Sequence, residues 1–143
     1  MIDGLIAGRL MGDASRRVDK AGRTYIVARV LARNKAAVME AALAAGARIV
    51  NDVSALRHDD RAMEVVLAAG CPVVLMHAPG AGEDLHKGGE YADVVSEVFD
   101  FLKSARAKAI AVGIAEDRII LDPGIGFGKS LAEHLALMNA LPL

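Results

Sequence analysis

The sequence predicts an α/β fold in which helices cover a parallel β-sheet. Short, almost entirely apolar segments alternate along the chain with segments that carry apolar residues at helical spacing. Of the 143 residues, 54% are hydrophobic and only 3% are aromatic, so the core must consist mainly of aliphatic side chains. Such a core suits strands that are buried on both faces, as in a parallel sheet.

Four segments have the composition of strands, because each is rich in β-branched and aliphatic residues. They are residues 25–31, 48–54, 72–76 and 118–121. The motif A-G-x-x-(I/V)-V occurs at residues 45–50 and again at 69–74, which favours a barrel over an open sheet. A complete eight-stranded barrel takes about 250 residues. The chain therefore predicts a partial TIM-type (β/α) barrel of about four βα units over residues 25–143, whereas residues 1–24 show no clear period and are left as a separate segment.

Helices are predicted between and after these strands, at residues 35–45, 59–69, 91–112 and 131–141. Gly46 and Gly70 can end the first two in a left-handed conformation, and Asp59 or Asp60 can cap the second. The third helix shows an apolar stripe made of Val94, Val98, Phe101 or Leu102, Ala105 and Ala109. Residues 77–90 hold four glycines and a proline, so we expect a long loop there.

Composition excludes several classes of protein. The formal net charge is −1, whereas a nucleic-acid binder needs a clustered basic excess. No apolar run approaches the ~18 residues of a membrane span, and the first 17 residues lack the pattern of a signal peptide. The single cysteine, Cys71, cannot form an internal disulfide. We therefore expect a cytoplasmic protein whose partners are neither nucleic acid nor a membrane.

Polar residues stand where three of the predicted strands end. Asn51 and Asp52 end the second strand, His77 the third and Asp122 the fourth. Because the carboxyl ends of parallel strands form one rim, these side chains predict a polar ligand site. Taken alone, Asp52 or His77 is explained equally well as a cap or a turn residue.

The segment LDPGIGFGKS, residues 121–130, is the strongest local signal. Pro123 disfavours a helical conformation at Asp122, and the glycines that follow allow a backbone to approach a ligand closely. A Walker loop would need glycine at position 123, and a dinucleotide fingerprint would need glycine at Lys129, so both nucleotide motifs are excluded. The four histidines lack the spacing of zinc ligands, and no metal-binding residue is predicted in this chain.

Three segments resemble consecutive parts of dihydropteroate synthase, in the same order: ARIVNDVSAL (47–56), CPVVLMHAPG (71–80) and RIILDPGIGFGKSLAEH (118–134). The resemblance covers residues 33–141. It implies a transferase of folate biosynthesis that condenses a dihydropterin methyl pyrophosphate with p-aminobenzoate and releases pyrophosphate, with Mg²⁺ on the pyrophosphate. It also implies site residues: Asn51, Met76 and Asp122 for the pterin, and Phe127 and Lys129 in the loop beside p-aminobenzoate.

The chain also departs from the pattern of that family. Ala32 stands where the family has a pterin-binding aspartate, Leu135 stands where asparagine is common, and residues 1–24 show no counterpart of the loop that holds magnesium. The family's later lysine and arginine–histidine pair would follow beyond residue 143. The hypothesis is therefore a truncated or frame-disrupted copy that is, by itself, a poor catalyst or none.

Two other interpretations remain open. The chain is either a non-catalytic pterin-binding remnant, including a half-barrel that forms a homodimer, or a domain related to methyltetrahydrofolate-binding methyltransferases. Segment 121–130 favours the synthase over the methyltransferase. Pterin binding and turnover distinguish the synthase from the remnant.

Overall fold

The computed structural model describes residues 9–10, 15–18, 24–27, 30–31, 35–80 and 88–141. The chain divides into two compact units, Met1–Arg48 and Ile49–Leu143, and each is described by itself. Ala32 and residues 81–87 of the predicted long loop lie outside the described residues.

The first unit contains short antiparallel pairs and one helix. Strand β1 (Arg9–Leu10) pairs with β4 (Val30–Leu31), β2 (Ser15–Val18) pairs with β3 (Thr24–Val27), and α1 spans Lys35–Ala44. The prediction that residues 25–31 form a strand of the parallel sheet is therefore wrong. Composition identified a β-forming segment, but pairing with the nearby residues 15–18 closes a short loop at low entropic cost.

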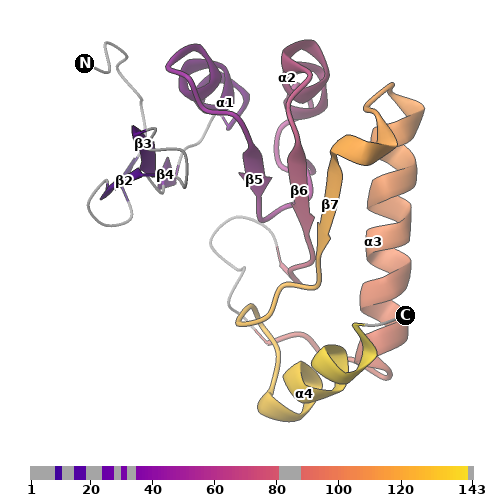
Figure 1. Cartoon of the computed structure of the whole chain (residues 1–143). Helices are drawn as coiled ribbons and strands as arrows, with labels where there is room; N and C mark the ends of the chain where they lie inside the picture. Colours follow the sequence, from indigo (N-terminus) through magenta and orange to yellow (C-terminus); the bar gives the residue numbers. More distant parts are fainter. Residues whose placement is uncertain are drawn as a thin grey trace. The chain divides into compact units, whose positions relative to one another are not determined.

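The second unit is built on a parallel sheet of three strands in the order β5-β6-β7 (Figure 1). The strands are β5 (Val50–Asp52), β6 (Val73–Met76) and β7 (Ile119–Asp122). The helices are α2 (Ala62–Ala69), α3 (Val94–Ala111) and α4 (Leu131–Ala140), with a short 3₁₀ turn at Glu116–Arg118. Strand–helix alternation is confirmed, with three parallel strands in place of about four.

Helix α2 begins later than predicted. Its first cap position is Arg61, which makes no capping hydrogen bond with its side chain. The Asp59 carboxylate accepts a hydrogen bond from the Arg61 N–H (3.1 Å), so it stabilises the turn before the helix. Gly70 ends the helix with φ of 58°, as predicted, and Gly46 follows α1 with φ of 97°.

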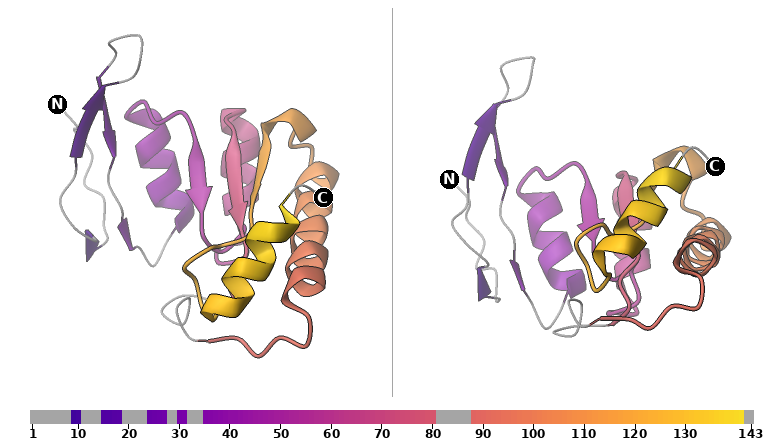
Figure 2. Two further views of the ribbon diagram at one scale, coloured as in Figure 1. Left: turned by 60° about the horizontal axis from the view of Figure 1, so that its bottom comes forward. Right: turned by 90° about the horizontal axis from the view of Figure 1, so that it is seen from below.

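Helix α3 buries the predicted stripe, with Leu102 and not Phe101 as its central buried residue. The Asp93 carboxylate caps the helix by accepting from the N–H groups of Val95 and Ser96. The helix packs on β6 and β7, and α4 packs on α3 through Leu137 (Figure 1). Two further views show α4 crossing near the carboxyl ends of the strands (Figure 2).

The two faces of this sheet differ. Alternate residues of β5 and β6, namely Val50, Asp52, Val73 and Leu75, are buried. On the opposite face, Asn51 is exposed, Val74 is half-buried and the Ile120 side chain is 48% exposed. Since side chains alternate along a strand, helices cover the β5 and β6 residues of one face. The other face is open at Asn51, Val74 and Ile120, although Met76, which also lies on it, is only 3% exposed.

Candidate functional site

The register of the sheet decides which predicted site residues share a face. Asn51 pairs with Val74, which pairs with Ile120, and Met76 pairs with Asp122. Because side chains alternate with a period of two, Asn51, Met76 and Asp122 all lie on the open face. Asn51 and Asp122 stand two strands apart, about 10 Å across the sheet.

Asp122 is the last residue of β7, and its two carboxylate oxygens differ in their hydrogen bonding. One oxygen, Oδ1, accepts a hydrogen bond from the Gly124 N–H (2.8 Å), which forms a tight turn directly after the strand. Among the described residues, the second oxygen has no hydrogen-bonding partner. Asp122 is half-buried. Its second oxygen is therefore an acceptor that a ligand can reach.

Lys129 folds back over the loop that follows Asp122. Its Nζ donates to the carbonyl oxygens of Gly124 (3.0 Å) and Phe127 (3.1 Å). Burial lowers the pKa of Lys129, and the negative charges of Asp122 and Glu133 oppose that shift. The ammonium group therefore holds the loop in shape and places a positive charge beside the site.

Met76 and Phe127 come together at this end of the sheet. Met76 is buried beside Ala78, and Val53 and Phe127 pack against the two of them. The sequence assigned Met76 and Phe127 to two different ligands, and the fold brings them into one apolar cluster. Phe127 therefore covers part of Met76, so a flat ring beside Asp122 would contact the cluster that the two residues form.

His77 connects the two loops that leave β6 and β7. Its N–H donates to the Asp122 carbonyl oxygen (2.9 Å), and its own carbonyl oxygen would lie 1.9 Å from a Cβ at position 124. Its buried ring packs edge-on against Phe101, with centroids 4.9 Å apart, and lies 5.9 Å from the Tyr91 ring. The His77 backbone therefore positions Asp122 and its turn.

The imidazole of His77 gives this region a pH dependence. Burial, with the nearby charges of Lys129 and Arg57, lowers the pKa of His77 from 6.5 to about 4. Between these two values the unfolded chain binds a proton that the folded chain does not, so stability falls as the pH drops from 6.5 towards 4. We expect a loss of roughly 3 kcal/mol in the free energy of unfolding across that window.

This expectation is checked by urea unfolding at pH 7 and near pH 4.5 in the wild type and in His77→Phe, which keeps an aromatic ring at the site. The pH-dependent loss should be smaller in His77→Phe, and His58→Gln, at an exposed histidine, should behave as the wild type. Equal pH dependence in all three proteins would show that His77 does not titrate as described.

Asp52 has the structural role that the sequence left open. Its carboxylate is buried and accepts from the Ser54 N–H (3.2 Å), the Ser54 hydroxyl (2.7 Å) and the Leu56 N–H (2.7 Å). These bonds hold a turn in which Ala55 and Leu56 have φ of 52° and 60°. Left-handed backbone at such residues costs about 1–2 kcal/mol each, which the Asp52 bonds help to offset.

Sequence reasoning missed two anchors of the loop after β7. His134 accepts a hydrogen bond at Nε2 from the Gly126 N–H (2.9 Å), and the Gly128 carbonyl oxygen accepts from the Gly89 N–H (3.0 Å). Neither contact has a local sequence signal, because the partners are eight and 39 positions apart. Both tie the loop to other parts of the site.

Within the described part of the chain, no three His, Cys, Asp or Glu side chains gather closely enough to hold a metal ion. In the same part of the chain, no helix is long and apolar enough to cross a membrane.

A parallel sheet of three strands with helices packed on one face defines the class of fold: part of a (β/α) barrel. Residues 33–143 match the family described as pterin binding enzyme, and the chain belongs to this family. The predicted pterin-binding family is thereby confirmed.

Individual relatives agree. A dihydropteroate synthase of Neisseria meningitidis serogroup B is 47% identical over 109 residues, which cover 73% of this chain and 38% of the relative. The structure of Xanthomonas albilineans dihydropteroate synthase with 4-aminobenzoic acid matches with a TM-score of 0.68 at 46% identity, covering 75% of this chain and 37% of that one. The same enzyme in complex with 7,8-dihydropteroate matches with a TM-score of 0.67 at 44% identity, with the same coverage. The chain thus spans less than two-fifths of the length of these relatives.

Proposed function

We propose that this chain carries the pterin-binding part of a dihydropteroate synthase, the transferase that joins a dihydropterin methyl pyrophosphate to p-aminobenzoate in folate biosynthesis. The observation that carries the proposal is the second carboxylate oxygen of Asp122, which has no described partner and faces the same side of the sheet as Asn51 and Met76. Relatives with this name and the bound molecules of the Xanthomonas structures support it.

The pterin would be recognised by charge and by hydrogen-bonding pattern. Its guanidine-like edge presents adjacent N–H donors, which a carboxylate accepts in charge-assisted bonds of about 1.5–3 kcal/mol each. Asn51 both donates and accepts, which suits the mixed edge of the ring. The apolar side chain of Met76 would contact the ring face.

The reaction needs little covalent help from the protein. The bond between the methylene carbon and the pyrophosphate oxygen breaks, and the amine of p-aminobenzoate then forms a bond to that carbon and loses a proton. The departing pyrophosphate leaves an electron-poor pterin, which the negative charge of Asp122 would stabilise. Phe127 and Lys129 would shape the loop on the side where p-aminobenzoate enters.

The resemblance also implies Mg²⁺ on the pyrophosphate. The described residues offer no set of ligands for it, so no step is assigned to the metal. The proposed pterin-binding domain covers residues 25–143, with residues 1–24 outside it, and the proposed location is the cytoplasm.

A second candidate is a non-catalytic pterin-binding half-barrel that forms a homodimer. The open sheet face favours it, since Ile120 is 48% exposed there and apolar faces of this kind promote association.

Two measurements on the purified 143-residue chain test the proposal. Calorimetry measures binding of the dihydropterin pyrophosphate, and a separate assay detects dihydropteroate. We expect saturable binding with little or no turnover, because relatives carry more than three-fifths of their length outside the matched segment. Turnover would establish the full activity in this chain alone and refute the second candidate. Absence of pterin binding by the folded chain would refute both candidates.

A further inference from the structure

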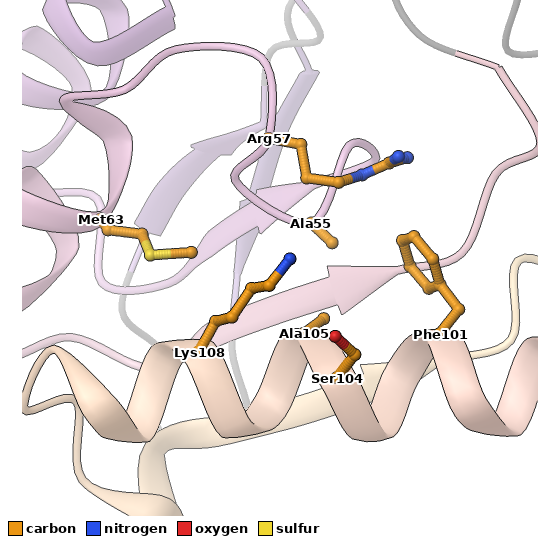
Figure 3. A pocket seen from close by; sticks show the side chains of 7 residues that line it. All are labelled: Ala55, Arg57, Met63, Phe101, Ser104, Ala105 and Lys108. Carbon is orange, nitrogen blue, oxygen red and sulfur yellow. The ribbon is translucent and has the colours of Figure 1, made fainter.

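A pocket of about 250 Å³ lies in the second unit, and none of the residues assigned to the pterin lines it. Its walls come from the turn after β5, from α2 and from α3 (Figure 3). The lining residues are Ala55, Arg57, Met63, Phe101, Ser104, Ala105 and Lys108. This volume is below the roughly 300–1,000 Å³ of pockets for drug-sized molecules, which restricts the pocket to a small ligand.

The charged residues of the pocket are both cations. The Arg57 guanidinium lies 4.6 Å from the centre of the Phe101 ring, and its Nε donates to the Ser54 carbonyl oxygen (2.9 Å). Among the described residues, these contacts leave the terminal nitrogens of Arg57 without a hydrogen-bond acceptor. The Lys108 side chain rises from α3 towards the turn that carries Ala55 and Arg57 (Figure 3). Within the part of the chain that the structure describes, no carboxylate pairs with either cation.

The remaining lining is mostly apolar. Met63 and Phe101 stand at opposite ends of the pocket, with Ala55 and Ala105 between them (Figure 3). The Ser104 hydroxyl adds one group that donates a hydrogen bond. Two cations with no carboxylate partner among the described residues, beside an apolar cleft, fit a molecule with an anionic group at one end and a small apolar body at the other.

We propose that this pocket binds a small aromatic anion, whose carboxylate or phosphate contacts Arg57 and Lys108 and whose ring packs on Met63 and the two alanines. The pocket shares no lining residue with the proposed pterin site, because its walls are the turn after β5 and helices α2 and α3. The proposal therefore does not depend on the proposed function.

The test is a titration of the purified chain, followed by NMR or calorimetry, with phenyl phosphate and benzoate as the two anions. Inorganic phosphate has the anionic group without the ring, and benzyl alcohol has the ring without the charge, so their affinities measure the contribution of each part alone. We expect saturable binding of at least one aromatic anion and at least tenfold weaker binding of inorganic phosphate and benzyl alcohol. The stronger of the two anions identifies the anionic group.

Variants locate the binding. Lys108→Gln and Arg57→Gln should each weaken it by about tenfold, and Lys103→Gln, at an exposed lysine on the same helix, should leave it unchanged. Arg57 also donates a hydrogen bond within the turn after β5, so Arg57→Gln could fail to fold. In that case the result for Lys108→Gln decides. Saturating pterin should not displace the anion.

Unchanged affinity in Lys108→Gln, displacement by the pterin, or no saturable binding of either aromatic anion would overturn the proposal. If benzoate bound at the loop after β7 and not in this pocket, its affinity would be the same in Lys108→Gln as in the wild type.

Discussion

Asp122→Asn is expected to weaken binding of the dihydropterin ring at least tenfold. Asparagine keeps an oxygen that can accept from the Gly124 N–H, so the turn after β7 should survive. It replaces the second oxygen with an NH₂ group, which donates and faces the N–H groups of the pterin. The loss of one charge-assisted bond, at about 1.5–3 kcal/mol, corresponds to roughly ten- to a hundredfold in affinity.

Calorimetry of the pterin pyrophosphate measures this effect. Asp117→Asn is the matched control, because it removes an exposed carboxylate just before the same strand, at its opposite end. We expect the control to bind as the wild type. If Asp122→Asn retained full affinity while remaining folded, Asp122 would not contact the pterin.

Gly124→Ala is expected to lower the free energy of unfolding by about 3 kcal/mol or more, and to abolish pterin binding. The added Cβ would lie 1.9 Å from the His77 carbonyl oxygen, a backbone atom that no side-chain rotation can move away. The residue also has φ of 72°, which costs a further 1–2 kcal/mol, roughly, for any residue with a Cβ. The turn that positions Asp122 would have to move.

Gly126→Ala separates these two causes. Gly126 has φ of 90°, but nothing lies within 4 Å of a Cβ built there, so only the backbone strain applies. We expect a loss of about 1 kcal/mol and nearly normal pterin affinity. Urea unfolding followed by circular dichroism is the suitable measurement, since the chain has no tryptophan. Similar losses in the two variants would show that the contact between His77 and Gly124 is not tight.

Much of the second unit was predictable because its signals are local. The stripe of α3 from Val94 to Ala109 repeats at helical spacing, and it is buried as expected. The left-handed stop at Gly70 likewise follows from the lack of a side chain. Local signals also misled. Asp59 or Asp60 was predicted to cap α2, but the cap position is Arg61. Asp59 instead stabilises the preceding turn, since either position satisfies the same short-range preference for an acceptor.

In the candidate site, too, local sequence signals predicted some features and only the fold decided others. Their position at strand ends alone did not say which of Asn51, Asp52 and Asp122 would face a ligand. The resemblance assigned Asn51 and Asp122 to the pterin and left the role of Asp52 open. The register places Asn51 and Asp122 on the open face and turns Asp52 inward, where three hydrogen bonds satisfy it. A slip of one residue would exchange the two faces.

The sequence by itself determined the family, the parallel α/β class and the order of most elements, because short motifs and side-chain periods are properties of neighbouring residues. Only the tertiary structure decided that β3 and β4 pair antiparallel, that Met76 meets Phe127, and that Arg57 and Lys108 line one pocket. Each of these depends on strand pairing or packing between segments far apart in the chain. Their free energy arises only once the whole unit folds, so no local pattern encodes it.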